Sequence, residues 1–273
     1  MTAVGATAGA EGENVAATAK SFVAARLAAR ATPDYPGRIP HTLDAAYAIQ
    51  EAAIGLFPDR IIGWKVGGVP PAQQAILGVH RVSGPIFARN LWTDTGANNV
   101  LPAIEGGFAA VEAEFIIRIG AGVDPARTDW TLADAYDAVD SVFIGVELAG
   151  SSLSAINDMG SAVVVSDFGN NGGLLIGAEL TDWRDRLDAI TVETTLNGVV
   201  VGAGGAPSLG GGAMESVRFL LGHCAGRGRP LTAGTLVSTG AVTGVHRAHI
   251  GDAFACAFGG VGVISGTVVR AEA

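Results

Sequence analysis

Hydrophobic positions near the start of the chain recur at helical spacing and predict two helices. The first covers residues 13–30 and should end before Pro33, because proline cannot continue a helix. The second runs from Thr42 to Pro58. Together they predict an N-terminal helical cap over residues 1–60, in which residues 1–12 are expected to be frayed. The apolar stripes consist of Val15, Phe22, Val23 and Leu27 in the first helix and Leu43, Tyr47, Ile54 and Phe57 in the second.

From residue 61 onward the pattern changes to short apolar runs separated by glycines, which is typical of strands. Asn197-Gly198 lies between two such runs and predicts a type I′ hairpin. Two further helices are expected, at residues 131–139 and 213–225. The pattern therefore predicts one β-rich domain over residues 61–273. The other strand candidates are residues 61–66, 111–119, 142–148, 162–166 and 174–176, and short strands between 231 and 269.

Composition narrows the classes of protein that this chain can represent. Of its 273 residues, 49% are hydrophobic and 16% are charged, so it can bury a large core and is not a charged disordered segment. Its 17 basic and 26 acidic residues give a formal net charge of −9, which does not favour binding to nucleic acid or to anionic membrane surfaces. Because so few residues are charged, we also expect a homo-oligomer with buried subunit faces.

Cysteine usage and the N-terminal segment indicate the compartment. Cys224 and Cys256 show neither zinc-site nor redox-motif spacing, so we expect two buried, reduced thiols. Residues 1–20 lack the charged and apolar regions of a signal peptide, and no apolar run is long enough to span a membrane. These features predict a cytoplasmic protein.

The strand predicted at residues 111–119 carries the most distinctive polar pattern of the chain. Its alternation places Glu112 and Glu114 on one face, about 7 Å apart along the strand, and the apolar residues on the other. A third carboxylate, Glu147, ends a second apolar strand. Three carboxylates with open positions for water or substrate suit Mg²⁺ or Mn²⁺ better than zinc. The alternative is that Glu112 and Glu114 form the solvated face of a half-exposed strand.

Lys65 lies within an apolar strand that leads into a glycine turn. Few sequence neighbours can solvate its ammonium group, so it pairs with a carboxylate or faces an anionic ligand. The alternative is a lysine on an edge strand whose head group reaches water.

Several segments occur in an order that a known family shares. They are residues 43–50, 63–67, 77–79, 111–114, 147, 227–234, 238–240 and 259–262. In this order and spacing the chain resembles the 2-keto-4-pentenoate hydratase family, in the hydratase and decarboxylase branch of the fumarylacetoacetate hydrolase superfamily. The resemblance covers nearly the whole chain after about residue 13, and the joint spacing is more specific than any single segment.

The resemblance implies an α+β fold in which the N-terminal helical part packs on a mixed β-roll of the fumarylacetoacetate hydrolase C-terminal-domain type. It implies a lyase that adds water to a 2-hydroxy-2,4-dienoate or 2-oxo-enoate to give a 4-hydroxy-2-oxo acid, as in aromatic catabolism by meta cleavage. The implied partner is thus a small 2-oxo or 2-hydroxydienoic acid.

The resemblance also assigns roles to residues. Glu112, Glu114 and Glu147 would hold Mg²⁺ or Mn²⁺, and Lys65 would bind the substrate carboxylate or move a proton. Asp167 would orient a metal-bound water or a ligand; the alternative is an ordinary turn residue. The implied substrate-binding residues are Val66, Gly67, Asn170, Asn171, Thr239 and Gly240.

Several loops depart from the family pattern. Residues 80–85, which include Val82, lack the acid that relatives carry there, and residues 168–171 and 210–212 also differ. An arginine often found after the third glutamate is replaced by Ser151 or Ser152. Three alternatives therefore stay open: decarboxylation of a 2-oxo-3-enedioate, C–C hydrolysis of an acylpyruvate, or a catalytically inactive binding homologue.

Two other patterns do not carry a site. Residues 202–212 are rich in glycine, but they lack the third glycine of a dinucleotide-binding motif and follow a hairpin strand, so we expect a substrate-side loop. His246 and His249 lie in a segment that we expect to be a loop, which favours solvated or subunit-contact histidines over metal ligands.

Overall fold

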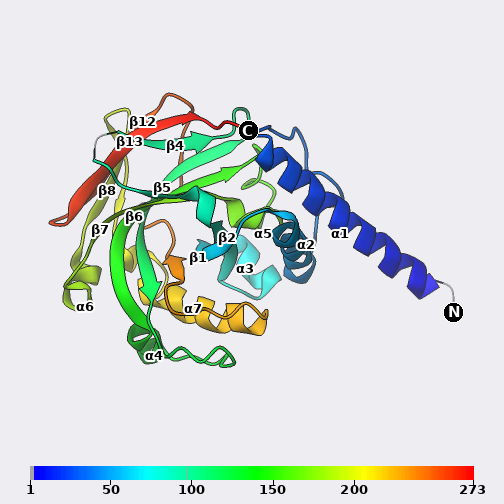
Figure 1. The fold of residues 1–273 in the computed structure, drawn as a ribbon, viewed down its shortest axis with the longest axis horizontal. Coiled ribbons are helices and arrows are strands. Elements are labelled where there is room, and N and C mark those ends of the chain that lie inside the picture. Colours follow the sequence, from blue (N-terminus) through cyan, green and yellow to red (C-terminus); the bar gives the residue numbers. More distant parts are fainter. Residues whose placement is uncertain (1–2, 97) are drawn as a thin grey trace.

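The computed structural model describes residues 3–96 and 98–273, and shows two curved sheets flanked by helices (Figure 1). Helix α1 (Ala3–Leu27) extends away from the rest of the molecule at its N-terminal end, and its C-terminal half packs on α2 (Leu43–Leu56). Ala19 and Val23 of α1 belong to the same buried cluster as Ile49 and Ala53 of α2. The side chain of Thr42 accepts a hydrogen bond from Ala45 N and so caps α2 at the predicted start.

The larger sheet has eight strands and contains the candidate site. Its order is β2-β1-β10-β5-β6-β7-β3, and β11 also pairs with β5. Because β1 pairs with β10 and β3 with β7 in parallel while the other pairs are antiparallel, the sheet is mixed. The strands are β1 (Ile61–Gly68), β2 (Arg81–Phe87), β3 (Leu91–Thr93), β5 (Phe108–Ile119), β6 (Val139–Ser151), β7 (Asn171–Glu179), β10 (Leu236–Ser238) and β11 (His246–Arg247).

The smaller sheet has five strands in the order β4-β13-β12-β8-β9, and it is also mixed because β13 and β4 are parallel. Its strands are β4 (Asn99–Ala103), β8 (Val192–Leu196), β9 (Val199–Gly204), β12 (Ala253–Phe258) and β13 (Gly262–Arg270). The remaining helices are α3 (Pro71–Leu77), α4 (Leu132–Asp137), α5 (Ser161–Ser166), α6 (Trp183–Arg186) and α7 (Ala213–Gly226). The predicted α+β architecture with curled mixed sheets is confirmed.

Two local predictions are confirmed by backbone geometry. Asn197 and Gly198 have φ values of 51° and 77°, so both central residues of the β8–β9 hairpin adopt the left-handed conformation of a type I′ turn. Thr131 and Asp134 form a capping box at the start of α4.

Two predictions differ from the structure. Residues 162–166 were predicted as a strand from their valines but lie in α5, where Val163 and Val165 are buried, so tertiary packing overrides β propensity. Helix α1 begins at Ala3 instead of near residue 13, which suits the many alanines of this segment. Of the segment expected to be frayed, residues 1 and 2 lie outside the described residues and the rest is helical.

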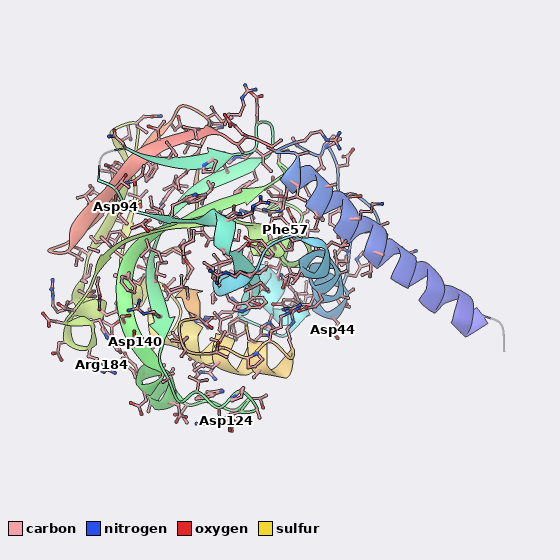
Figure 2. The ribbon with its side chains drawn as sticks, in the orientation of Figure 1. Asp44, Phe57, Asp94, Asp124, Asp140 and Arg184 are labelled. Carbon is pink, nitrogen blue, oxygen red and sulfur yellow. The ribbon has the colours of Figure 1, made fainter. Side chains whose placement is uncertain are left out.

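The distribution of side chains separates a dry interior from a charged surface. Phe57, which directly follows α2, is buried against Phe87 and Phe168, whereas Asp124, Asp140 and Arg184 lie on the outside (Figure 2). Strand β5 is buried on both faces along most of its length, so its polar residues face the interior of the protein. In the described residues, none of the helices combines the length and the apolar character that a membrane crossing requires.

Candidate metal centre

Strands β5 and β6 bring the three glutamates together. Glu112 pairs directly with Glu147 across the two strands, and Glu114 lies two residues further along the same face of β5. Glu112 is 5% exposed, and Glu114 and Glu147 are fully buried. Each side chain offers one oxygen that lies within 4.8 Å of the oxygens of the other two. The alternative that Glu112 and Glu114 form a solvated face is therefore wrong.

In two of these carboxylates, only one of the two oxygens accepts a hydrogen bond. Ser238 Oγ and the Gly240 backbone N–H donate to Glu114 Oε2 at 2.5 Å and 2.8 Å, and Asn171 Nδ2 donates to Glu147 Oε1 at 2.9 Å. Glu114 Oε1 and Glu147 Oε2 are buried without a hydrogen-bond partner. Unpartnered buried acceptors are unfavourable, and oxygen ligands are those that Mg²⁺ and Mn²⁺ prefer. The donor set therefore fits a hard divalent cation.

Lys65 lies beside this cluster, on β1 between β2 and β10. It pairs in register with Ser238, is 5% exposed, and places Nζ 3.3 Å from Glu147 Oε1. The structure thus contradicts the alternative of an edge-strand lysine that reaches water, and confirms that the amine pairs with a carboxylate.

Charge in the cluster is unbalanced, because one lysine faces three carboxylates. Burial raises the pKa of Glu112 to about 7, although Lys65 lowers it. Burial and the neighbouring carboxylates raise the pKa of Glu114 well above its usual value. Burial lowers the pKa of Lys65, but the three carboxylates outweigh this effect and raise it overall. The site therefore favours additional positive charge, as a cation would provide.

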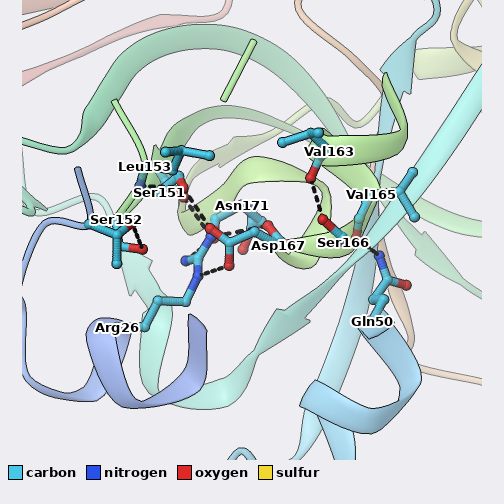
Figure 3. Close-up of polar contacts among 12 residues, drawn as sticks. Arg26, Gln50, Ser151, Ser152, Leu153, Val163, Val165, Ser166, Asp167 and Asn171 are labelled. Carbon is cyan, nitrogen blue, oxygen red and sulfur yellow. Dashed lines mark hydrogen bonds and ion pairs between the residues drawn. The ribbon is translucent and has the colours of Figure 1, made fainter. Parts of the chain in front are cut away.

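Asp167 is buried next to the cluster but is already engaged by other side chains (Figure 3). Arg26 of α1 places Nε 2.5 Å from Asp167 Oδ1, and Ser151 Oγ donates to Asp167 Oδ2 at 2.6 Å. Arg26 Nη1 also donates to the backbone oxygen of Asn171, whose side chain holds Glu147. Three successive contacts, through Arg26 and Asn171, thus link Asp167 to the candidate ligand Glu147. Its proposed role toward water or substrate stays a prediction.

The predicted substrate-binding residues divide between two places. Val66, Thr239 and Gly240 line a cavity of about 520 Å³, and the buried hydroxyl of Thr239 has no hydrogen-bond partner. Gly67 lies two residues after Lys65 on β1, and a Cβ at Gly67 would lie 3.9 Å from Lys65 Nζ. Asn171 donates a hydrogen bond to Glu147, as described above.

Asn170 has a positive φ of 62°, and its Nδ2 donates to Asn157 Oδ1 at 3.2 Å. Asn170 Oδ1 is buried without a hydrogen-bond partner, and a role of Asn170 toward substrate stays a prediction.

Two of the three altered loops carry buried side chains, whereas Gly210 and Gly211 of the third are exposed. Val82 is buried with Val69 and Val165, and Phe168 is buried against Phe57 and Phe87. Gly211 and Gly212 have φ values of 82° and 80° immediately before α7. Residues 208–211 line the same cavity as Thr239. Of the loop expected at residues 202–212, residues 202–204 belong to strand β9, and a role of the rest toward substrate stays a prediction.

The cysteines and histidines lie apart from the cluster. Cys224 and Cys256 are buried and free, as predicted. His246 lies in the short strand β11 and not in a loop, because it pairs with Val111 of β5, and the exposed His249 lies 3.5 Å from Asp252. Metal ions are commonly bound by His, Cys, Asp and Glu side chains. Within the described part of the chain, the three glutamates form the one group of three or more of these side chains that lie close enough together to hold a metal ion.

Sequence reasoning missed Arg26 and the roles of Ser151 and Ser238. Arg26 contacts a residue 141 positions away, which the helical pattern of residues 13–30 does not indicate. Ser238 was part of a recognised segment, but nothing in the sequence indicated that its hydroxyl would bind Glu114.

The chain is similar in sequence to hydratases and to a decarboxylase. The chain is 27% identical to the TodF product hydratase of Pseudomonas putida, over 84% of this chain and 85% of that protein. It is 27% identical to 2-keto-4-pentenoate hydratase 1 of Dechloromonas aromatica, over 81% and 84%. It is also 27% identical to the 4-oxalocrotonate decarboxylase of Pseudomonas putida, over 94% and 97%.

A solved structure of 4-oxalocrotonate decarboxylase from Pseudomonas putida G7 matches the fold with a TM-score of 0.77 at 25% identity, covering 94% of this chain and 98% of that one. Residues 86–269 match the model of the fumarylacetoacetate (FAA) hydrolase C-terminal family. The order of segments noted in the sequence, the mixed curled sheets and this match agree: the chain belongs to the fumarylacetoacetate hydrolase C-terminal family.

Proposed function

We propose that this chain is a divalent-metal-dependent hydratase that adds water to a 2-hydroxy-2,4-dienoate or 2-oxo-enoate to give a 4-hydroxy-2-oxo acid. The observation that carries the proposal is the buried cluster of Glu112, Glu114 and Glu147 beside Lys65. Relatives named as hydratases along more than 80% of their length support the reaction class. Structures of the related decarboxylase were solved with calcium and acetate and with magnesium and adipate, which supports a divalent cation. We propose Mg²⁺ or Mn²⁺ as that cation.

Each residue of the cluster has a distinct role in this proposal. Glu112, Glu114 and Glu147 would hold the cation, which when bound supplies Lewis-acid polarisation of the substrate's carboxylate and 2-oxygen. Lys65 binds the substrate carboxylate or carries the proton that moves during ketonisation. Ser238 and Gly240 fix the orientation of Glu114, and Asn171 fixes that of Glu147.

A second candidate reaction is decarboxylation of a 2-oxo-3-enedioate. It is favoured by the alignment with 4-oxalocrotonate decarboxylase, which covers 94% of this chain, more than the hydratase alignments cover. Hydrolysis of an acylpyruvate and a catalytically inactive homologue are further outcomes that the same experiment distinguishes.

The test is an assay of the purified protein with Mg²⁺ or Mn²⁺ against a 2-hydroxydienoate, an oxalocrotonate and an acylpyruvate. We expect turnover of the dienoate by the parent and by Glu105→Gln, an exposed control on the surface, and loss of at least about 100-fold in Glu114→Gln. Faster release of CO₂ from oxalocrotonate would favour the second candidate. Absence of turnover on all three substrates would contradict an enzymatic function.

We also propose that the protein acts in the cytoplasm as a homo-oligomer. The two buried free thiols suit a reducing compartment, and the low share of charged residues suits buried subunit faces. Light scattering after size-exclusion chromatography measures the subunit number, and a monomer at micromolar concentration would contradict this proposal.

A further inference from the structure

Strands β6 and β7 leave their regular register next to the metal cluster. Leu148 of β6 pairs with Gly173 of β7, whereas the next residue of β6, Ala149, pairs with Asn171. Gly172 is therefore an extra residue of β7 that has no partner in the register. One extra residue in a strand is a β-bulge, and it moves the side chains beyond it to the other face of the sheet.

The bulge decides on which face of the sheet the Asn171 side chain lies. In an unbroken register Asn171 would pair with Gly150 and point away from Glu147, because successive residues of a strand alternate between faces. With the bulge it pairs with Ala149, which lies two residues after Glu147 and on the same face. Asn171 Nδ2 accordingly donates to Glu147 Oε1 at 2.9 Å. The bulge therefore directs the Asn171 amide at a candidate metal ligand.

The guanidinium of Arg26 binds both strands at this bulge (Figure 3). Its Nη1 donates to the backbone oxygen of Asn171 in β7, and its Nη2 donates to that of Gly150 in β6, each at 2.8 Å. Its Nε lies 2.5 Å from Asp167 Oδ1, so a buried carboxylate balances its charge. Only 9% of the Arg26 side chain is exposed. Arg26 thus holds β6 and β7 together where the bulge interrupts the regular hydrogen-bond ladder.

The planar shape of the guanidinium suits these acceptors. Each of the three nitrogens of Arg26 binds a different group, and their N–H donors lie in one fixed plane. A lysine carries a single nitrogen on a flexible stem. It could keep the ion pair with Asp167, but it could not also bind the two carbonyl oxygens on the neighbouring strands.

We propose that Arg26 is a positioning residue of the metal centre, which holds the bulge of β7 so that Asn171 stays bound to Glu147 and the site binds a divalent cation more tightly. The inference rests on the proposed function, because it requires a cation at the three glutamates. Groups that orient a metal ligand through a hydrogen bond typically change metal affinity by about 10–100-fold. Helix α1 thus contributes to cation binding through Arg26, although it provides none of the three carboxylates.

A double-mutant cycle on Mg²⁺ affinity, measured by titration calorimetry, tests the proposal without requiring turnover. We expect Asn171→Ala and Arg26→Gln each to weaken Mg²⁺ binding by at least about 10-fold. The double variant should bind Mg²⁺ within about 2-fold of the weaker single variant, because Arg26 acts on the site through the Asn171 amide. Asn171→Ala keeps the backbone oxygen that Arg26 binds, so it removes the contact with Glu147 and leaves the clamp on the bulge in place.

Two further variants separate positioning from a general loss of stability. Trp183→Ala removes a buried ring from α6, so it should lower stability to a similar extent and leave the Mg²⁺ affinity at the parent value. Arg26→Lys keeps the charge that Asp167 requires and so retains the fold. It should still weaken Mg²⁺ binding, because one nitrogen cannot bind both carbonyl oxygens.

Three results would overturn this inference alone. They are parent-like Mg²⁺ affinity in Arg26→Gln or Arg26→Lys, an equal loss of affinity in Trp183→Ala, and losses that multiply in the double variant. If Arg26→Gln lacks a native circular dichroism spectrum, the same cycle with Arg26→Lys decides the point. If the parent itself binds neither Mg²⁺ nor Mn²⁺, the proposed function is contradicted as well.

Discussion

His223 shows how burial sets the charge of a single side chain. It lies on α7 between the rings of Tyr47 and Phe219, with centroid distances of 5.0 Å and 4.8 Å. Its Nε2 is buried without a hydrogen-bond partner. Burial, and to a smaller extent the charge of Arg227, lowers the pKa of His223 to about 4. The imidazole is therefore neutral in the folded protein at pH values where the unfolded chain binds a proton.

This shift predicts that stability decreases as the pH falls from about 6.5 toward 4. In that window the unfolded state binds a proton that the folded state resists, so the free energy of unfolding rises with pH. At pH 5 the expected loss relative to pH 7 is about 2 kcal/mol from this residue. Urea unfolding at pH 7 and pH 5 measures it, with His223→Phe as the variant that keeps a ring in the stack. An equal pH dependence in the parent and the variant would contradict the prediction.

Helix α1 is joined to the sheet through Arg26. The guanidinium of Arg26 bonds Asp167 and the backbone oxygens of Asn171 and Gly150, so a residue of the N-terminal helix supports the loop that holds Glu147 (Figure 3). Removing one partner of a buried ion pair leaves the other charge uncompensated, and this costs more than the pair itself contributes.

We therefore expect Arg26→Gln to lower the free energy of unfolding by about 3–5 kcal/mol. Arg30→Gln, at an exposed position just after the same helix, is the matched control and should change it by less than about 0.5 kcal/mol. Denaturant unfolding of both variants decides the point. A loss in Arg26→Gln no larger than that in the control would show that the contact is energetically unimportant.

Gly84 of β2 and Gly68 of β1 allow a second comparison between a variant and its matched control. A Cβ at Gly84 of β2 would collide with the backbone oxygen of Phe168, whereas a Cβ at Gly68 of β1 would meet nothing within 4 Å. We predict that Gly84→Ala lowers the free energy of unfolding by at least about 1–3 kcal/mol and that Gly68→Ala is nearly neutral. Thermal unfolding measures both, and similar midpoints for the two variants would contradict the close approach of β2 to residue 168.

The sequence predicts elements well where their signals are local. The capping box at Thr131 and the Asn197-Gly198 turn depend on neighbours within three residues, and both are confirmed. Residues 162–166 were assigned wrongly because the burial of Val163 and Val165 depends on distant elements. The same reason explains why the sequence did not predict strand β2, which begins at Arg81.

At the scale of the whole molecule, a cation bound by Glu112, Glu114 and Glu147 would couple binding to folding. A cation held by the folded protein but not by the unfolded chain stabilises the native state by mass action, about 2.7 kcal/mol at a concentration one hundred times its dissociation constant. Removal of a candidate ligand should abolish this stabilisation.

We accordingly expect Mg²⁺ to raise the Tm of the parent and of Glu105→Gln by several degrees, and to leave the Tm of Glu114→Gln unchanged. The chelated form of Glu114→Gln should be at least as stable as the chelated parent, because one of three crowded buried carboxylates is then neutral. Differential scanning calorimetry with Mg²⁺ or EDTA measures both effects. A Tm of the parent that is insensitive to Mg²⁺ and Mn²⁺ would contradict the metal assignment.

The alternation of side chains along the strands and the family resemblance predicted part of the candidate site. They identified Glu112, Glu114, Glu147 and Lys65, which the structure brings together. They did not identify Arg26, because its partners are distant in sequence and are defined only by the packing of α1 on the sheet.

The contact of Arg26 with Asp167 has a consequence for synthesis on the ribosome. Arg26 leaves the exit tunnel long before its partners, because 141 residues separate it from Asp167. At about 5–20 residues per second, this interval is on the order of 10 s. During that time Asp167, the partner of Arg26, has not yet been synthesised. The native attachment of the first helix is therefore a late event of biogenesis, and it finishes only after the strands that carry the three glutamates have been made.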